Sequence, residues 1–178
     1  MRRILWLVLV VGCSPKSPPK QEEPIPTPPS DPNLLRLAPP RAWTSQIPTS
    51  KLRKAQYSVP DKEKESADAE IVYFYFGSFG GGSLEDNIDR WVGQFKGATR
   101  ESAKIEKAQG IYPVTFVDLT GTHQAERPDA VEQSGARMIV AAIESSMGVH
   151  YLKLVGPGST VDDWADEFRA ISLAARIP

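Results

Sequence analysis

The distribution of apolar side chains divides the sequence into three unequal parts. A first apolar run covers residues 4–11, and the stretch after it contains almost no apolar periodicity. In the rest of the chain, short apolar segments alternate with glycine, proline and charged residues, as in a folded domain. We therefore expect a short N-terminal segment at residues 1–12, a tether at residues 13–40 and one globular domain at residues 41–178.

Seven segments of the expected domain have the pattern of β-strands. Residues 71–76 form the strongest of them, because all six side chains are apolar or aromatic. Two apolar faces predict a central strand that is covered on both sides. Pro48 directly follows the first segment, which predicts an edge strand. The other strands are expected at residues 43–47, 52–59, 104–108, 111–122, 136–144 and 149–155.

Two amphipathic helices complete the pattern. We expect Ser83 to cap the first, with Asp86 at the third helical position, and Gly97 to end it. We expect Thr160 to cap the second, with Asp163 at the third position. The apolar stripes are Leu84, Ile88, Trp91, Val92 and Phe95 in the first helix, and Val161, Trp164, Phe168 and Ile171 in the second.

The order of these elements is three strands, a helix, four strands and a helix. Short turns between neighbouring strands predict an α+β fold, with an antiparallel sheet of about six or seven strands and two main helices packed on it. This element order resembles the PsbP-type α/β/α sandwich, named for an extrinsic subunit of the photosynthetic oxygen-evolving complex. Likeness in fold does not by itself imply an activity, and the same holds for the second similarity described next. The closer similarity is to uncharacterised bacterial lipoproteins of environmental species, in the motifs Phe74-Tyr75-Phe76-Gly77, Gly81-Gly82-Ser83, Asn87-Ile88 and Arg90-Trp91.

The N-terminus has the features of an export signal. Two arginines precede the apolar run, and the run ends in the small residue Gly12. The run is too short to remain as a membrane span, which needs about 20 residues. The sequence Val-Val-Gly-Cys ending at Cys13 resembles the bacterial lipobox. That resemblance implies cleavage between Gly12 and Cys13, and a diacylglyceryl group and further fatty acid such as palmitate on Cys13. An ordinary signal peptide with a stray cysteine is the alternative.

Lipidation of Cys13 implies that the protein binds a membrane through this residue. Ser14 follows the cysteine, and this resembles the outer-membrane default of Gram-negative bacteria. We therefore expect a lipid-anchored protein of the cell envelope, in the outer membrane and facing the periplasm.

Proline dominates the tether. Ten of the 16 prolines lie between residues 15 and 40, which favours polyproline II and solvated coil over packed structure. A spacer between membrane and domain is the favoured interpretation, and a proline-rich ligand for a partner is the alternative. Leu34, Leu35 and Leu37 are the apolar cluster of the tether and are candidates for docking on the domain.

Composition and charge exclude several classes of function. With 21 Lys and Arg against 22 Asp and Glu, the net charge is −1, so no global basic field favours nucleic acid. One cysteine excludes an internal disulfide and a cysteine-only metal cluster. His123 and His150 are the two histidines, and neither has a ligand at metal spacing. We therefore expect no metal and no cofactor.

The glycine-rich stretch between the strongest strand and the first helix is the best candidate for ligand binding. A strand, flexible backbone and a helix N-terminus can bind phosphate or carboxylate through free N–H groups. The stretch lacks the Lys-Ser/Thr pair of a P-loop and the spacing of a dinucleotide turn. Glycines that only let the chain turn onto the sheet are the alternative. The candidate residues are Gly77, Phe79, Gly80, Gly81, Gly82 and Ser83.

We expect no catalytic residues, because nucleophile motifs are missing from the sequence and the thiol of Cys13 is expected to carry lipid. Asp118 and Glu144 lie in apolar strands, where a raised pKa would make an acid–base group, but their places near strand ends favour solvated carboxylates. His123 follows Asp118 by five residues, which places the two on opposite faces of a strand. His150 is expected to be partly buried or at an edge.

The pattern thus predicts a non-catalytic binding or assembly module of the envelope, with an unknown envelope protein or small ligand as partner. The alternative is an envelope hydrolase that uses Asp118 or Glu144.

Overall fold

The computed structural model describes residues 31–78, 80–124 and 131–178. The export signal, Gly12, Cys13, the first part of the tether and Phe79 therefore lie outside the described residues. None of the helices in the described ranges is both long and apolar enough to cross a membrane.

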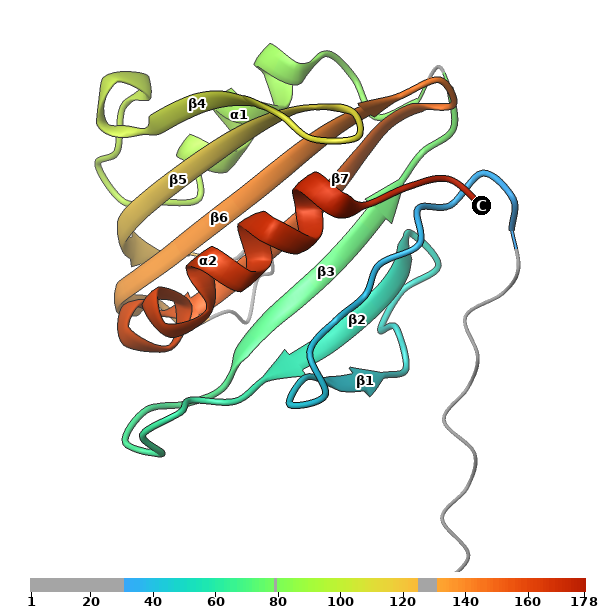
Figure 1. Ribbon diagram of the computed structural model, residues 1–178. Helices are drawn as coiled ribbons and strands as arrows, with labels where there is room; N and C mark the ends of the chain where they lie inside the picture. Colours follow the sequence, from blue (N-terminus) through green and yellow to red (C-terminus); the bar gives the residue numbers. More distant parts are fainter. Residues whose placement is uncertain (1–30, 79, 125–130) are drawn as a thin grey trace, which may run out of the picture.

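In the described part of the chain, one antiparallel sheet of seven strands forms the centre, which confirms the predicted α+β class. The spatial order is β1-β2-β3-β7-β6-β5-β4, so β3 pairs with β7 and joins the first three strands to the last four (Figure 1). The strands are β1 Thr44–Gln46, β2 Arg53–Val59, β3 Ala69–Tyr75, β4 Lys104–Gln109, β5 Pro113–His123, β6 Gln133–Ser145 and β7 Gly148–Pro157.

A helix lies on each face of the sheet (Figure 1). The long helix α2, Gly158–Ala174, lies over β6 and β7, and the short helix α1, Leu84–Val92, lies on the opposite face. A 3-10 turn, η1 Arg100–Ser102, follows α1. Because side chains alternate along a strand, the sheet supplies two separate hydrophobic cores, one under each helix. We call the two sides the α1 face and the α2 face.

The segment before β1 runs beside α2 on the α2 face (Figure 1). Leu34 and Leu35 are buried in the same core as Phe168 of α2, as the apolar cluster of the tether predicted. The backbone of Arg36 pairs with that of Arg176 near the end of the chain. Packing therefore begins before residue 41, the expected start of the domain.

The start of α1 is as predicted, but its end is not. The Ser83 hydroxyl accepts a hydrogen bond from the Asp86 amide at 3.0 Å and donates to the Asp86 carboxylate at 2.6 Å. The helix ends at Val92, with Gly93 as its cap, well before Gly97. Glycine weakens the helix at this point, and beyond it the Lys96 amide donates to the Thr122 carbonyl of β5, while the Gln94 carbonyl accepts from the Gln124 amide.

Thr160 does not cap α2, so that prediction is wrong. The helix begins earlier, at Gly158, with Pro157 at the cap position. Proline suits a helix start because it has no backbone N–H to satisfy. Thr160 lies inside the first turn, where its hydroxyl donates to the Ala67 carbonyl at 2.9 Å. The predicted stripe is confirmed, since Val161, Trp164 and Phe168 are buried and Ile171 packs against the same core.

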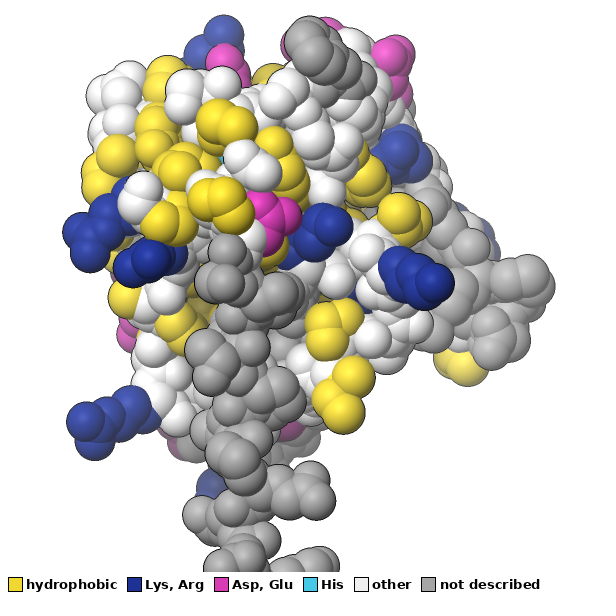
Figure 2. Space-filling model, turned by 90° about the vertical axis from the view of Figure 1, so that its right-hand side faces the viewer, with side chains coloured by type: hydrophobic (Ala, Val, Ile, Leu, Met, Phe, Trp, Pro, Cys, Tyr) yellow, Lys and Arg dark blue, Asp and Glu magenta, His cyan; other side chains and the backbone are white. Residues whose placement is uncertain are grey.

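The sheet edge at β1 is exposed to solvent. All three residues of β1 are exposed, and the nearby Ile47 and Leu52 are 82% and 60% exposed. Figure 2 shows the molecule from this side, and the hydrophobic side chains that gather in its upper left, with Lys and Arg side chains around them, lie above the level of β1. Pro48 ends the edge strand as the sequence predicted.

Candidate functional site

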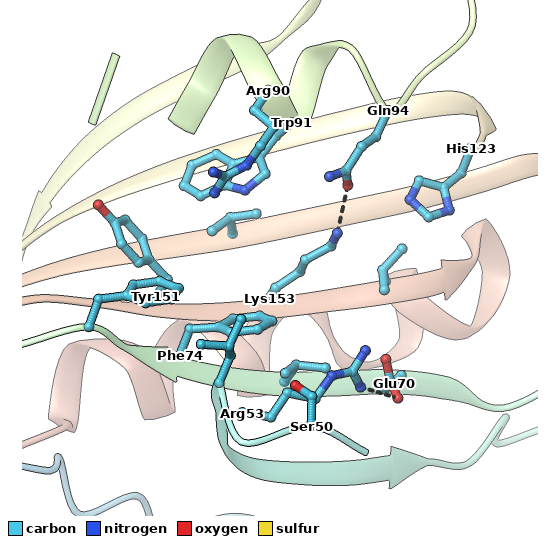
Figure 3. Close-up of a pocket in the computed structure, with 15 residues that line it drawn as sticks. Ser50, Arg53, Glu70, Phe74, Arg90, Trp91, Gln94, His123, Tyr151 and Lys153 are labelled. Atoms are coloured by element: carbon cyan, nitrogen blue, oxygen red, sulfur yellow. Dashed lines mark hydrogen bonds and ion pairs between the residues drawn. The ribbon is translucent and has the colours of Figure 1, made fainter. Parts of the chain in front are cut away.

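A cavity of about 590 Å³ lies on the α1 face of the sheet. Its floor consists of side chains from β3, β6 and β7, with α1 and the residues after it on one side and β2 on the other (Figure 3). Ser50 and Leu52, which precede β2, form part of its outer wall. Cavities that bind small molecules measure about 300–1,000 Å³, so this one has the size of a ligand site.

The second apolar face of β3 explains the cavity. Ile71 and Tyr73 are buried in the core under α2, as the pattern predicted. Val72 and Phe74 point to the other side and line the cavity, and the predicted cover of this face is confirmed at Val72, which is 2% exposed, but only partial at Phe74, which is half-buried. The buried core under α1 takes its strand side chains from β5, β6 and β7, and β3 contributes only the half-buried Phe74 at its margin.

Aromatic rings form the apolar end of the cavity. Phe74 and Phe76 stack with ring centroids 6.1 Å apart, and Tyr151 lies 6.4 Å from Phe76. Trp91 of α1 meets Tyr151 edge-on at 5.6 Å. Burial raises the pKa of Tyr151, so its hydroxyl stays protonated at neutral pH. Offset and edge-on rings of this kind offer flat apolar surfaces to a ligand.

Cationic side chains outnumber acidic ones in the cavity lining. Lys153 rises from the middle of β7 and donates to the Gln94 side-chain carbonyl at 2.7 Å (Figure 3). Arg53 pairs with Glu70 at 2.9 Å on the β2 side, and Arg90 lies at the end of α1. Three cations against one carboxylate give this cavity a positive potential, although the whole chain is nearly neutral.

His123 supplies a further polar group. Only 8% of the residue is exposed, its ring packs 5.2 Å from Phe95, and it extends toward Gln94 and Lys153 (Figure 3). Burial and the charge of Lys153 lower its pKa, so the ring is neutral at pH 7. Its Nε2 atom has no hydrogen-bond partner among the described residues. A buried polar atom left without a partner costs about 1–3 kcal/mol.

The glycine loop that the sequence singled out lies next to this cavity but does not line it. A Cβ atom on Gly80 would come 2.2 Å from the Phe76 carbonyl oxygen, and one on Gly81 would come 2.9 Å from the Phe76 ring. Positive φ angles at Gly77, Gly81 and Gly82 also favour glycine. These contacts explain the glycines by tight packing, and their role in binding a ligand stays a prediction.

Asp118 and Glu144 lie on opposite faces of the sheet. Asp118 is 8% exposed on the α2 face, where Arg137 donates to both its oxygens, at 3.0 and 2.6 Å. These hydrogen bonds raise the pKa of Arg137. The prediction of a solvated rim carboxylate is therefore wrong for Asp118 and confirmed for the exposed Glu144. No site in the described structure holds both carboxylates. Asp118 and His123 also lie on opposite faces, as their spacing predicted.

His150 is fully buried in β7, at 0% exposure, so the expectation of a partly buried or edge residue is wrong. Its Nδ1 lies 2.8 Å from the Tyr73 hydroxyl, and its Nε2 lies 2.8 Å from the Ser145 hydroxyl. The ring also stacks on Tyr75 at 4.4 Å. A histidine next to a serine is a catalytic arrangement in many hydrolases, so the direction of the hydrogen bonds matters.

The surrounding donors fix that direction. The Leu35 amide donates to the Tyr73 hydroxyl at 2.9 Å, and burial raises the pKa of Tyr73, so this hydroxyl donates in turn to His150 Nδ1. We assign the proton of His150 to Nε2, which donates to Ser145, while the Ser145 hydroxyl donates to the Gly148 carbonyl at 3.0 Å. The Ser145 proton points away from the imidazole. The chain of hydrogen bonds therefore holds the β6–β7 turn in place.

Sequence reasoning named His123 and Arg90 without placing them in a cavity, and it missed Lys153, Gln94 and Arg53. Lys153 was the one signal that pointed to it, since a lysine in the middle of the apolar run 149–155 must reach a polar partner or solvent. Gln94, Arg53 and Arg90 lie on elements that looked ordinary in the sequence.

The described ranges contain no group of three or more His, Cys, Asp or Glu side chains that could hold a metal ion. No protein-family model matches this chain, and no curated protein matches it either.

Proposed function

We propose that this protein is a lipoprotein of the cell envelope, anchored through Cys13 in the outer membrane and facing the periplasm. Its globular domain binds a small ligand in the cavity of the α1 face and does not convert it chemically. The sequence around Cys13 supports the anchor, and the proline-rich tether gives the domain reach from the membrane.

The cavity carries the proposal for the domain. It combines aromatic walls, a few polar side chains and a volume of about 590 Å³, which are the properties of small-molecule sites. A hydrolase acting through Asp118 or Glu144 is disfavoured, because Asp118 is held by Arg137 and Glu144 lies on the other face. Neither of these carboxylates lines the cavity.

Metabolic labelling with a fatty-acid analogue tests the anchor. We expect the wild-type chain to take up label and to remain with membranes, and Cys13→Ala to lose both properties. Ser14→Ala is the matched control, because it alters the neighbouring residue and keeps the thiol. Label retained by Cys13→Ala contradicts the proposal.

Binding of 1-anilinonaphthalene-8-sulfonate, an aromatic anion that fluoresces in apolar sites, tests the cavity. The full-length Cys13→Ala chain allows the measurement without detergent. We expect saturable binding that Val155→Phe weakens by about tenfold, because the larger ring fills the cavity. Val149→Phe is the control, since Val149 packs in the α1-face core from the same strand without lining the cavity. No binding, or equal binding by both variants, contradicts the proposal.

A further inference from the structure

We propose that the turn between β1 and β2, residues 47–52, makes a second contact with the membrane. In this contact Ile47 and Leu52 enter an anionic bilayer, and the basic side chains around them bind lipid phosphates. We call residues 47–52 the β1–β2 turn. The contact rests on the proposed envelope location for its biological role. Its test uses a chain without lipid, so the anchor and this contact fail in different experiments.

The β1–β2 turn presents two large apolar side chains to solvent. Ile47 is 82% exposed and Leu52 is 60% exposed, and the residues between them are exposed as well. Lys51 is the one charged residue of the turn, and its long side chain can keep its ammonium group in water while the neighbouring side chains enter the bilayer. The turn therefore has the apolar tip and the basic flank of an interfacial membrane contact.

Hydrogen bonds hold the turn in one conformation. The Arg53 amide donates to the Ser50 carbonyl at 3.2 Å, and the Thr49 amide donates to the Gln56 side-chain carbonyl at 3.2 Å. Backbone groups that are already paired lose little when they leave water, and a preformed turn loses little conformational entropy on binding. The turn can therefore meet a bilayer without refolding.

The segment that contains the turn is strongly basic. Residues 32–60 include five Lys or Arg and no Asp or Glu, whereas the whole chain has a net charge of −1. Arg53 pairs with Glu70 at 2.9 Å. Each Lys or Arg near an anionic membrane strengthens binding by about fivefold, so this charge complements lipid phosphates. The basic residues that form no ion pair with a described residue are Arg36, Arg41, Lys51 and Lys54.

Two arginines lie next to each other on the same side of the molecule. The Arg36 amide donates to the Arg176 carbonyl at 2.7 Å, and both residues are exposed. Like charges on paired residues repel each other, and a layer of phosphates would offset this repulsion. Figure 1 shows the blue start of the described chain, its C-terminus and the β1–β2 turn on the right-hand side. Figure 2 shows Lys and Arg side chains spread over this side.

The opposite edge of the sheet differs in charge. Strand β4 also exposes an apolar side chain, Ile105 at 40%, and two lysines, Lys104 and Lys107. Glu106 alternates with them and pairs with Arg169 at 3.3 Å, so both signs of charge are mixed along this edge. A bilayer of anionic lipid should therefore bind the β1 edge and not the β4 edge, and β4 supplies matched controls.

Tethering makes a weak contact sufficient. The proposed anchor Cys13 precedes Asp31, the first described residue, by 18 residues. An extended proline-rich chain of this length reaches at most roughly 56 Å, at about 3.1 Å per residue. The turn then meets the bilayer at a high effective concentration, as an intramolecular partner. The anchor sets the distance of the domain from the membrane, and the turn sets its orientation.

Sedimentation with lipid vesicles tests the contact. We would use the chain from residue 13 with Cys13→Ala, because the export signal is itself apolar and the described strands and helices all lie within residues 31–178. We expect at least about tenfold tighter binding to phosphatidylcholine vesicles with about 30% phosphatidylglycerol than to phosphatidylcholine alone, and about 0.5 M salt should remove most of this preference. Equal binding to both vesicles overturns the inference. No binding also overturns it and favours an acidic protein as the partner of this surface.

Paired substitutions locate the contact. Lys51→Gln combined with Lys54→Gln should weaken binding to the anionic vesicles by about tenfold, and Lys104→Gln combined with Lys107→Gln should change it by less than about twofold. Both pairs remove two positive charges, so the net charge is matched. Equal losses in the two pairs overturn the inference, because they would mean that no particular surface binds.

A fluorescent label reports directly whether the turn enters the bilayer. The chain has one cysteine, so Leu52→Cys in the Cys13→Ala background carries a single thiol for a nitrobenzoxadiazole dye. We expect the emission to shift to shorter wavelength when anionic vesicles are added. The same dye on Ile105→Cys, at the exposed edge of β4, should show no shift. Equal shifts at both positions, or no shift at Leu52→Cys, overturn the inference.

Discussion

The two faces of one sheet are covered in different ways. On the α2 face, a helix of 17 residues and the segment before β1 together cover the strands, and buried polar groups such as His150 and Asp118 have partners. On the α1 face, a helix of nine residues covers only part of the sheet, and a cavity lies over the rest. The strands supply apolar side chains to both faces alike.

The two helices differ in length, and α2 shares the covering of its face with the segment before β1. At about 1.5 Å per residue, α2 extends about 25 Å and α1 about 13 Å. Figure 1 shows that α2 lies along β6 and β7, and that the segment before β1 lies over the strands beside it. The same apolar strand can therefore contribute to a closed core on one face and to a ligand site on the other. The elements that cover each face determine which of the two forms.

Shortening one phenylalanine on each face should give the largest contrast. Phe168 is 1% exposed in the α2-face core, so Phe168→Ala should lower the free energy of unfolding by about 3–5 kcal/mol. Phe74 is half-buried at the cavity, so Phe74→Ala should lower it by only about 1 kcal/mol. Urea unfolding of both variants measures the difference. Equal losses would mean that the α1 face is packed as tightly as the α2 face.

A fall in pH should destabilise the protein mainly through His150, which is buried on the α2 face. Burial lowers the pKa of His150 to about 4, below its ordinary value near 6.5. As pH falls below about 6.5, the unfolded chain binds a proton first, so stability decreases until pH reaches about 4, by up to about 3 kcal/mol. Urea unfolding between pH 7 and pH 4 should show this slope, and His150→Gln should reduce it.

The matched comparison for this titration is His123→Phe. The pKa of His123 is also lowered, so removal of His123 should reduce the slope too, but by less, because the pKa shift of His150 is the larger one. If His150→Gln keeps the wild-type slope, buried His150 is not the group that senses acid.

Enlarging adjacent residues of β6 should separate the faces by a smaller amount. Ala141 lies in the α2-face core at 0% exposure, so Ala141→Phe should destabilise the fold by about 1–3 kcal/mol through overpacking. Val140 is equally buried but lines the cavity, so the ring of Val140→Phe can extend into the cavity and should cost less than about 1 kcal/mol. Thermal unfolding distinguishes the two. A larger loss of stability in Val140→Phe than in Ala141→Phe would contradict a cavity on the α1 face.

A glycine in the loop before α1 should give the smallest effect. Gly77 has φ +84°, and a Cβ atom there would meet nothing within 4 Å. Gly77→Ala should therefore cost about 1 kcal/mol of stability through backbone conformation alone, and ligand affinity should stay unchanged. A loss of binding without a loss of stability would instead support the loop as a ligand site.

Local patterns were enough to predict much of the fold. The hairpin of β6 and β7, the apolar stripes and the Ser83 cap follow from alternation, periodicity and hydrogen-bond chemistry within a few residues. The end of α1 was not predictable in this way. The chain leaves the helix where the Lys96 amide finds a partner at Thr122 of β5 and the Gln94 carbonyl finds one at Gln124, both far away in the sequence.

The site was much harder to predict than the fold. Val72 and Phe74 have the same pattern whether a helix covers them or a ligand does, so the cavity has no signature in the strand itself. The glycine loop drew attention because of its composition, yet its glycines are explained by contact with Phe76. Lys153 carried the useful information, since a charge within an apolar strand requires a tertiary reason.

The backbone pairing of Arg36 with Arg176 joins the two ends of the described chain, and this has a consequence for the order in which the protein folds. Residues 34 and 35 are available early when a chain emerges N-terminus first, but α2, which covers the same core, is made after all seven strands. The α2 face therefore closes only once α2 has been made, and the segment before β1 is then fixed together with the residues after α2. Loss of the last few residues would leave the segment before β1 without its backbone partner and would open this core from two sides at once.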